Sequence, residues 1–431
     1  MKKTLHTTLA LCPQCLTELE ARVYTEGESA VWMERTCPDH GRTTTRVWND
    51  VQHYQWLNSL AFPKVPPENT LPSKKPCPFG CGTCGRHERK GTLLEIEVTK
   101  QCNLRCPVCF MSAENGDDDP SFEEISAMFD TIEKAVGIDG AIQLTGGEPT
   151  CRKDLPAIIS LGREKGFWGI ELNTNGLVIA SRDGYLEELK AAGLTGVYLS
   201  FDGLKDEIYR VTCGRDLLDV KLKAIQRCRE ADLQVVLAAT IVAGLNQMYL
   251  GDLLRFCLEN NDVVVGLALQ PAFTSGRFEA KRSDVLTMGD VIFDLAQQSE
   301  GLIEPYDIWP LGCSHPLCDT GTFLVKNPEG SGVEYYPVTR SLTREDYLAS
   351  YDPRSPQGSV FHDILAKSGV SGYGGLSLII MNYMDVFSLD VQRLRECSMM
   401  VAVPDGRTIP FCSYHLTDAE GKRIYPPWGK D

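Results

Sequence analysis

Cysteine is the residue type that most restricts how this chain can fold. The chain has 17 cysteines in 431 residues. Nine of them fall in three tight groups before residue 110. The first residues carry two lysines but no apolar stretch, so we expect no signal peptide and a cytoplasmic location, where stable disulfides are rare. The grouped cysteines therefore predict metal sites.

Composition excludes several classes of protein. An apolar content of 43% supports a large buried core, and a net charge of −15 argues against nucleic acid as the main partner. No apolar run approaches the roughly 18 residues that a membrane-spanning helix needs. The length suggests two or three domains.

From residue 93 onward, short apolar runs alternate with segments of helical periodicity. We expect strands at 93–99, 141–145, 168–172, 196–201, 234–242 and 263–269. We expect helices at 122–136, 155–164, 185–192, 217–231 and 249–259. This alternation predicts an α/β fold with a parallel sheet, open or curled into a partial (β/α)6 TIM-type barrel. Ligands then bind at the carboxyl ends of the strands.

Two motifs follow the first two of these strands. The first has the spacing C-x3-C-x2-C, with Cys102, Cys106 and Cys109. Three thiolates this close can wrap one iron–sulfur cube and leave its fourth iron without a protein ligand, although a zinc knuckle is the alternative. The second is Gly146-Gly147-Glu148-Pro149, whose glycines let the backbone approach a ligand and whose carboxylate could accept from an ammonium.

Together these motifs resemble the radical SAM superfamily over residues 93–270. The resemblance implies that the three cysteines are catalytic and hold a [4Fe–4S] cluster that binds S-adenosylmethionine (SAM). Reductive cleavage of SAM would give a 5′-deoxyadenosyl radical that abstracts hydrogen from an unactivated carbon. The implied SAM contacts are Gly146, Gly147, Glu148, Asn173, Asn175, Ser200 and Asp202. For Asn173 and Asp202, plain loop capping is an equal alternative.

Seven further cysteines are candidate ligands of two auxiliary clusters. Cys77, Cys81 and Cys84 repeat the C-x3-C-x2-C spacing, and four more lie late in the chain: Cys313, Cys318, Cys397 and Cys412. Two four-ligand cubes need eight ligands. Either a histidine is the eighth ligand, with His87 and His315 the nearest candidates in the sequence, or one iron has no protein ligand.

The N-terminal cysteines form a different pattern. Cys12, Cys15, Cys37 and His40 give C-x2-C followed by C-x2-H, a tetrahedral set for structural zinc or a rubredoxin-like iron. Unliganded surface thiols are the alternative. Cysteines 151, 213, 228 and 257 are interpreted as packing residues.

The chain as a whole resembles the class D radical SAM methyltransferases and the archaeal tetraether lipid synthases. This resemblance implies three [4Fe–4S] clusters, one mononuclear zinc or iron and C–C bond formation at an unactivated carbon. We favour a lipid chain as substrate, with a tunnel lined by 376–380 and 263–269, although both read equally as core strands. The alternative is C-methylation of a pterin with a methylene-folate-type donor and carboxylates such as Asp385 or Asp390, which are equally good N-caps.

We expect four regions: a rubredoxin- or zinc-ribbon-like module at 1–62, a linker with a cluster segment at 63–92, the partial barrel at 93–275 and an auxiliary-cluster domain at 276–431. The expected partners are a small-molecule or lipid substrate and an electron donor such as flavodoxin or ferredoxin, with peripheral membrane contact left open. The competing class is a metal-stapled binding protein without catalytic activity.

Overall fold

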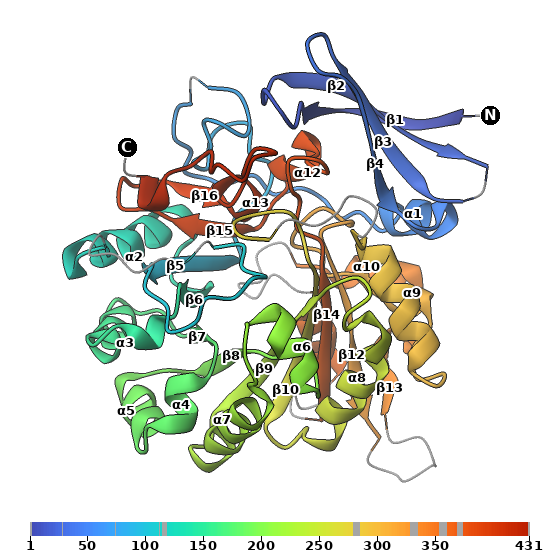
Figure 1. Ribbon diagram of the computed structural model, residues 1–431. Coiled ribbons are helices and arrows are strands. Elements are labelled where there is room, and N and C mark those ends of the chain that lie inside the picture. Colours follow the sequence, from blue (N-terminus) through green and yellow to red (C-terminus); the bar gives the residue numbers. More distant parts are fainter. Residues whose placement is uncertain are drawn as a thin grey trace.

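The computed structural model describes residues 2–27, 29–73, 75–111, 113, 119–278, 285–327, 335–352, 360–368 and 374–429. In this part of the chain the strands form one four-stranded and one twelve-stranded sheet. Figure 1 shows the small sheet at one end of the molecule, beyond the large sheet and its helices. None of the helices described is both long and apolar enough to cross a membrane.

The centre of the large sheet consists of the six parallel strands that the sequence predicts, paired in chain order. They are β5 (Leu93–Thr99), β6 (Ala141–Gly146), β7 (Ile170–Thr174), β8 (Gly196–Ser200), β9 (Gln234–Ile241) and β10 (Val264–Pro271). The prediction of an α/β fold is thereby confirmed. No closed barrel is present among the described residues, but side chains from β5 through β10 line one shared cavity, so the sheet is strongly curled.

Seven helices connect these strands (Figure 1). They are α2 (Phe122–Val136), α3 (Leu155–Glu164), α4 (Leu177–Ser181), α5 (Tyr185–Ala192), α6 (Asp206–Thr212), α7 (Leu218–Glu230) and α8 (Leu250–Glu259). Helix α2 begins at a capping box between Ser121 and Glu124 and buries an apolar stripe against the sheet. The short helices α4 and α6 lie in segments for which the sequence predicts no helix.

The region after residue 276 contributes strands to both edges of the same sheet. On one side β14 (Gly375–Met381) lies parallel to β10, and β12 (Asp319–Lys326) pairs with β14 in the antiparallel sense. On the other side β15 (Met399–Ala402) lies parallel to β5. Segments 376–380 and 263–269, considered above as tunnel walls, are strands of this sheet. Their alternative interpretation as core strands is confirmed.

The remaining strands extend these two edges. They are β11 (Trp309–Pro310) and β13 (Tyr335–Pro337) on β12, and β16 (Thr408–Pro410) on β15. The helices of this region are α9 (Met288–Gln298), α10 (Arg344–Ser350), α11 (Val360–Ser368), α12 (Val391–Arg395) and α13 (Phe411–Tyr414). Figure 1 shows α13, β15 and β16 beside β5.

The small sheet is an antiparallel meander followed by one helix. Its elements are β1 (Lys2–Leu11), β2 (Glu18–Glu26), β3 (Val31–Cys37), β4 (Gly41–Trp48) and α1 (Val51–Asn58). Arg35 donates from Nε to the Leu11 carbonyl at 2.6 Å and from Nη2 to the Val386 carbonyl at 3.1 Å. Thr8 donates to Asp390 at 2.6 Å. These buried bonds hold the small sheet against the C-terminal region.

Candidate active site

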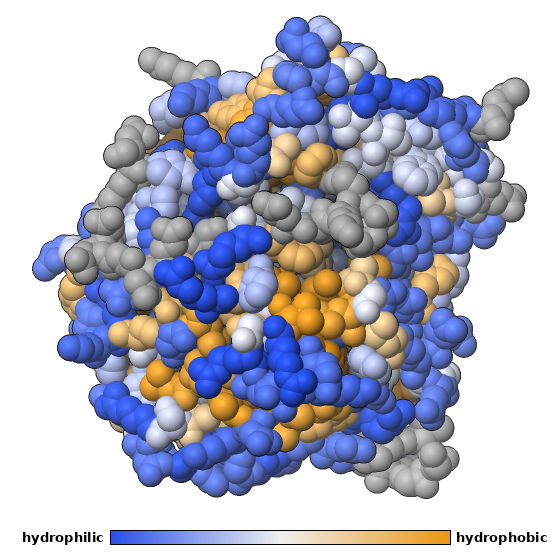
Figure 2. All heavy atoms as spheres, viewed as in Figure 1, coloured by the Kyte–Doolittle hydropathy of each residue, from blue (hydrophilic) through white to orange (hydrophobic). Residues whose placement is uncertain are grey.

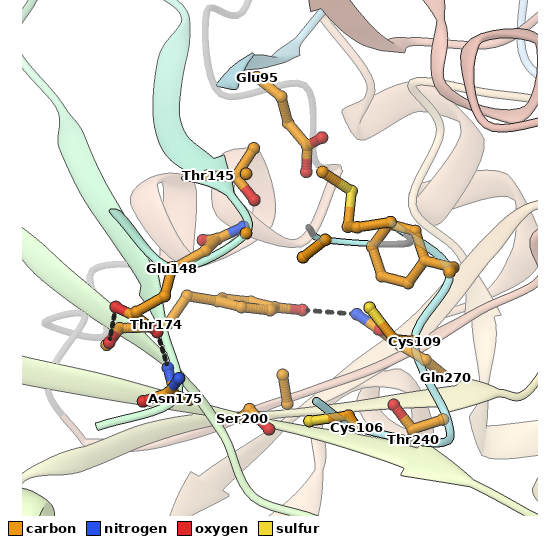
Figure 3. Close-up of a pocket in the computed structure, with 18 of the residues that line it drawn as sticks. Glu95, Cys106, Cys109, Thr145, Glu148, Thr174, Asn175, Ser200, Thr240 and Gln270 are labelled. Atoms are coloured by element: carbon orange, nitrogen blue, oxygen red, sulfur yellow. Dashed lines mark hydrogen bonds between the residues drawn. The ribbon is translucent and has the colours of Figure 1, made fainter. Parts of the chain in front are cut away.

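The curled sheet surrounds a cavity at the carboxyl ends of its strands. Cys102, Cys106 and Cys109 line it together with Gly146, Gly147, Glu148, Asn173, Asn175 and Ser200. Figure 3 shows the labelled side chains converging from several strands, with Glu95 and Glu148 in different parts of the wall. On the outer surface, Figure 2 shows apolar residues gathered in the middle of the face around α6, within a hydrophilic rim.

The two glycines of the second motif fit against the cysteine loop. A Cβ atom on Gly146, which has φ of +131°, would lie 2.2 Å from the Thr99 carbonyl oxygen, and one on Gly147 would lie 2.3 Å from that of Gln101. The backbone N–H of Gly147 donates to the Thr99 carbonyl at 2.8 Å. Glycine is thus required here by close backbone packing.

Glu148 connects the ends of two strands. It is 1% exposed, and its Oε1 accepts from the backbone and hydroxyl of Thr150 and from the Thr174 hydroxyl at 2.7 Å. Its Oε2 accepts from the backbone N–H of Asn175 at 2.7 Å. The carboxylate therefore organises the loop in front of the cysteines.

The other implied SAM contacts divide into two groups. Asn173 lines the cavity, and its buried Oδ1 has no hydrogen-bond partner within the described residues, which fits a ligand that donates there. Asn175 donates from Nδ2 to Asn103 in the cysteine loop at 2.7 Å. Asp202 lies outside the cavity wall and accepts from the backbone N–H of Thr240 at 3.0 Å, which fits the loop-capping alternative.

A fourth cysteine, Cys213, lies beside the cysteine loop. A hydrogen bond between its thiol and that of Cys106 is the main cause that raises the pKa of Cys106, followed by burial. Cys213 ends α6 and packs with Leu104. Because more than 100 residues separate Cys213 from Cys106 and α6 has a weak sequence signal, the sequence did not reveal this contact.

Two further buried polar residues belong to the site. Lys221 has no exposed surface and donates from Nζ to the Asn175 carbonyl at 2.8 Å; burial lowers the pKa of its ammonium group. Glu95 on β5 is 4% exposed and lines the cavity; burial, together with Glu97, raises its pKa to about 8. The alternation Leu94-Glu95-Ile96-Glu97 within a strand was the available signal.

The N-terminal cysteines and histidine come together as the spacing predicts. The ligand atoms of Cys12, Cys15, Cys37 and His40 all lie within 4.8 Å of one another. The Cys37 sulfur is 3.5 Å from Nδ1 of His40. Three thiols and one imidazole at these distances fit a tetrahedral metal ion.

Three of the late cysteines, Cys318, Cys397 and Cys412, lie around one buried region. Burial is the main cause that raises the pKa of Cys397, and the nearby thiols of Cys412 and Cys318 add to the shift. Arg393 donates to the Cys318 sulfur at 3.4 Å, and the backbone N–H of Met384 donates to that of Cys412 at 3.4 Å.

The two histidines considered as extra ligands have backbone contacts. Nε2 of His87 lies 2.8 Å from the Cys397 carbonyl oxygen. Nδ1 of His315 accepts from the backbone N–H of Leu317 at 3.2 Å. One ring nitrogen of each histidine is therefore already engaged.

Comparisons with known proteins agree with this geometry. The radical SAM superfamily matches residues 96–257, and the HMPTM N-terminal zinc ribbon domain matches residues 4–49. The chain is 32% identical to 7,8-dihydro-6-hydroxymethylpterin dimethyltransferase of Methanocaldococcus jannaschii, covering 97% of this chain and 96% of that protein.

Other relatives match over less of their length. A probable GTP 3′,8-cyclase of Pyrococcus abyssi is 35% identical over 42% of this chain and 57% of its own. The solved structure of Streptococcus suis SuiB with its precursor peptide SuiA is 18% identical, with a TM-score of 0.41, covering 50% of this chain and 46% of SuiB.

The curled parallel sheet with its cysteine loop and glycine motif is that of a radical SAM enzyme. The chain belongs to the radical SAM superfamily. This membership implies a [4Fe–4S] cluster and SAM, and it excludes the alternative of a binding protein without catalytic activity. One relative that matches nearly the whole chain is a pterin dimethyltransferase.

Proposed function

We propose that this protein is a radical SAM C-methyltransferase that acts on a pterin. Similarity to a pterin dimethyltransferase extends over 97% of the chain and includes the zinc ribbon region. This supports the pterin alternative over the lipid chain that the sequence favoured. The tetraether-synthase hypothesis has no support among the named relatives and stays a prediction.

The observation that carries the proposal is a set of polar groups within a largely apolar cavity. Its wall includes carboxyl, amide and hydroxyl groups from successive strands: Glu95, Gln143, Thr145, Tyr198 and Gln270. Of these groups, Glu95 has no hydrogen-bond partner within the described residues, so an alkyl chain packed against it would leave a buried carboxyl group unpaired, at a cost of about 1–3 kcal/mol. A pterin ring offers donors and acceptors along its edges.

At the end of the cavity that would bind SAM, the protein's residues position the cofactor and shield it from water. When bound by Cys102, Cys106 and Cys109, a [4Fe–4S] cluster supplies the electron that cleaves SAM reductively. Glu148 holds the loops of β6 and β7 in place through its hydrogen bonds to Thr174 and Asn175. Gly146, Gly147 and Ser200 line the cavity at this end, where they would contact the methionyl and ribose groups of SAM.

We assign the remaining cysteines to two auxiliary clusters. One site would use four late cysteines: Cys313, Cys318, Cys397 and Cys412. The thiols of Cys412 and Cys318 both raise the pKa of Cys397, and that of Cys318 raises the pKa of Cys412, which supports the grouping of these three. The other would use Cys77, Cys81 and Cys84, with one iron open. Engagement of His87 and His315 with backbone groups argues against histidine as an eighth ligand.

Cys12, Cys15, Cys37 and His40 would hold one zinc ion, because the zinc ribbon family covers this segment. We further propose that residues 1–62 act as a structural module, that 63–92 link it to the sheet and that 276–431 carry the auxiliary cluster. Flavodoxin or ferredoxin would supply electrons, and a cytoplasmic location would suit both.

The test is anaerobic reconstitution followed by product analysis. We expect about twelve irons and one zinc per chain, SAM cleavage on reduction and a pterin product heavier by one or two methyl groups. The triple variant C102A/C106A/C109A should lose about four irons and all SAM cleavage. A modified lipid with an unchanged pterin would refute the proposal, and zinc alone without SAM cleavage would refute the cluster assignment.

A further inference from the structure

Glu95 lines the cavity but takes no part in the proposed binding of SAM. It is 4% exposed, yet its carboxyl group faces the cavity, as Figure 3 shows. Within the described residues it has no hydrogen-bond partner. A buried carboxyl group without a partner is costly, so a group of this kind indicates a ligand that supplies donors.

The polar side chains near Glu95 form hydrogen bonds with other residues. Strand register places Glu95 next to Gln143, and Gln143 next to Glu171. Gln143 donates to Glu171 at 2.9 Å and accepts from Asn173 at 3.2 Å. On the far side of the cavity, Gln270 donates to the Tyr198 hydroxyl at 3.1 Å.

The distance between Glu95 and the cysteine loop leaves room for one flat ring system in the cavity. Glu95 lies four residues before Thr99, which pairs with Gly146 at the strand end, so it sits about 13 Å below the cysteine loop at about 3.3 Å per residue. The wall of the same cavity carries the thioethers of Met381 and Met399 and the ring of Tyr383. Such side chains pack well on an aromatic face.

We propose that Glu95 is a specificity-determining residue that accepts two parallel N–H bonds from the aminopyrimidinone edge of the substrate. This inference rests on the proposed pterin function and adds the residue and the edge that it recognises. A ring N–H beside an exocyclic amine matches a carboxylate in the paired geometry that makes such hydrogen bonds strong. The other ring of the substrate then points toward the strand ends and the SAM site.

Equilibrium binding to the reconstituted protein, with SAM present and no reductant, tests this role. The probes are 7,8-dihydro-6-hydroxymethylpterin and its analogue with oxygen in place of the 2-amino group, together with the fragments isocytosine and uracil. Wild type should prefer the amino compound of each pair. Glu95→Gln should weaken pterin binding roughly 10- to 100-fold and lose both preferences.

The matched control is Glu171→Gln, the same change at a half-buried position on a nearby strand, where the carboxyl group already pairs with Gln143. It should retain both preferences. SAM affinity and iron content should be unchanged in Glu95→Gln, which separates loss of recognition from misfolding. Glu95→Asp should recover part of the lost affinity.

The outcomes separate this inference from the proposed function. Pterin affinity within threefold of wild type in Glu95→Gln, or no preference for either amino compound in wild type, would overturn the role of Glu95. If wild type prefers isocytosine through Glu95 but methylates no pterin, the recognition role stands and the proposed function fails.

Discussion

Two buried glutamates in one cavity have opposite hydrogen-bonding situations. Glu148 accepts four hydrogen bonds from Thr150, Thr174 and Asn175, whereas Glu95 has no partner within the described residues. The protein itself therefore fixes the position of the Glu148 carboxylate, whereas the Glu95 carboxyl group can accept hydrogen bonds from a ligand. This contrast gives each residue a separate measurable signature.

Replacing Glu148 by Gln should weaken SAM binding roughly 10- to 100-fold, because an amide replaces a carboxylate that holds two loops through charge-assisted bonds. Binding of SAM to the reconstituted protein measures this effect. Iron content should stay near that of wild type. An unchanged SAM affinity would contradict the role given to this carboxylate.

Glu95 should make stability depend on pH. Its pKa is raised from 4.5 to about 8, so the folded protein holds this proton more tightly than the unfolded chain does. The stabilising effect is complete below pH 4.5 and is lost as pH rises toward 8. Relative to wild type, Glu95→Gln should gain stability over this range, up to about 5 kcal/mol above pH 8.

Anaerobic thermal unfolding of both proteins between pH 5 and pH 9, without substrate, measures this difference. Glu187→Gln, at an exposed position on α5, is the control and should show a flat difference across the range. A flat difference for Glu95→Gln as well would show that its carboxyl group is solvated rather than buried.

At the scale of elements, the end of β6 and the cysteine loop form one packed unit. Gly146 and Gly147 touch the carbonyl oxygens of Thr99 and Gln101, and Gly276 lies against that of Cys109. Because these contacts are backbone to backbone, the loop cannot move aside cheaply when a side chain is added.

Gly147→Ala should therefore displace the cysteine loop, since its Cβ would lie 2.3 Å from the Gln101 carbonyl oxygen. We expect loss of most SAM cleavage with the zinc site intact. Reductive formation of 5′-deoxyadenosine and metal analysis measure the two effects. Gly169→Ala is the control for loss of a glycine, because its φ is not positive and its Cβ would meet only the Ala141 Cα atom, at 4.0 Å. Equal activity of both variants would contradict the packing argument.

The zinc ribbon is a second element-scale unit. Cys37→Ser removes one of four ligands and should release about one zinc per chain while leaving iron unchanged. Hydrogen exchange should rise in β1 to β4 and stay unchanged in β5 to β10. Loss of iron instead of zinc would reassign the site.

At the scale of the whole molecule, one buried arginine joins three distant segments. Arg89 donates to the carbonyls of Phe62 and Gly312 and pairs with Glu396 at 3.1 Å, where both side chains are at most 5% exposed. Arg89 therefore connects the linker with the segment before β12 and with the C-terminal region.

Arg89→Met removes one of the two cations that pair with buried Glu396, the other being Lys64 at 2.9 Å, and it leaves the carbonyls of Phe62 and Gly312 without their donor. It should cost about 2–3 kcal/mol. Thermal unfolding of the reconstituted protein measures the loss. Arg182→Met breaks the exposed pair with Glu188 and should cost less than 1 kcal/mol. Similar losses in the two variants would contradict the joining role of Arg89.

Most of the central fold could be predicted from the sequence. The strand at 93–99 and the helices at 122–136, 155–164 and 185–192 have the expected limits. These segments carry strong local periodicity, and local pattern is what a sequence displays directly. The strands beyond residue 276 could not be placed, because pairing of β14 with β10 and of β15 with β5 depends on contacts between distant segments.

The sequence by itself determined the chemistry of the metal sites, because ligand spacing in tight loops is a local property. It identified the cysteine loop, the glycine motif and the four N-terminal ligands. Only the tertiary structure decided what surrounds them: Cys213 beside Cys106, Lys221 bonded to Asn175, and Glu95 in the cavity with no hydrogen-bond partner among the described residues. These contacts exist because a curled sheet brings side chains from separate strands to one centre.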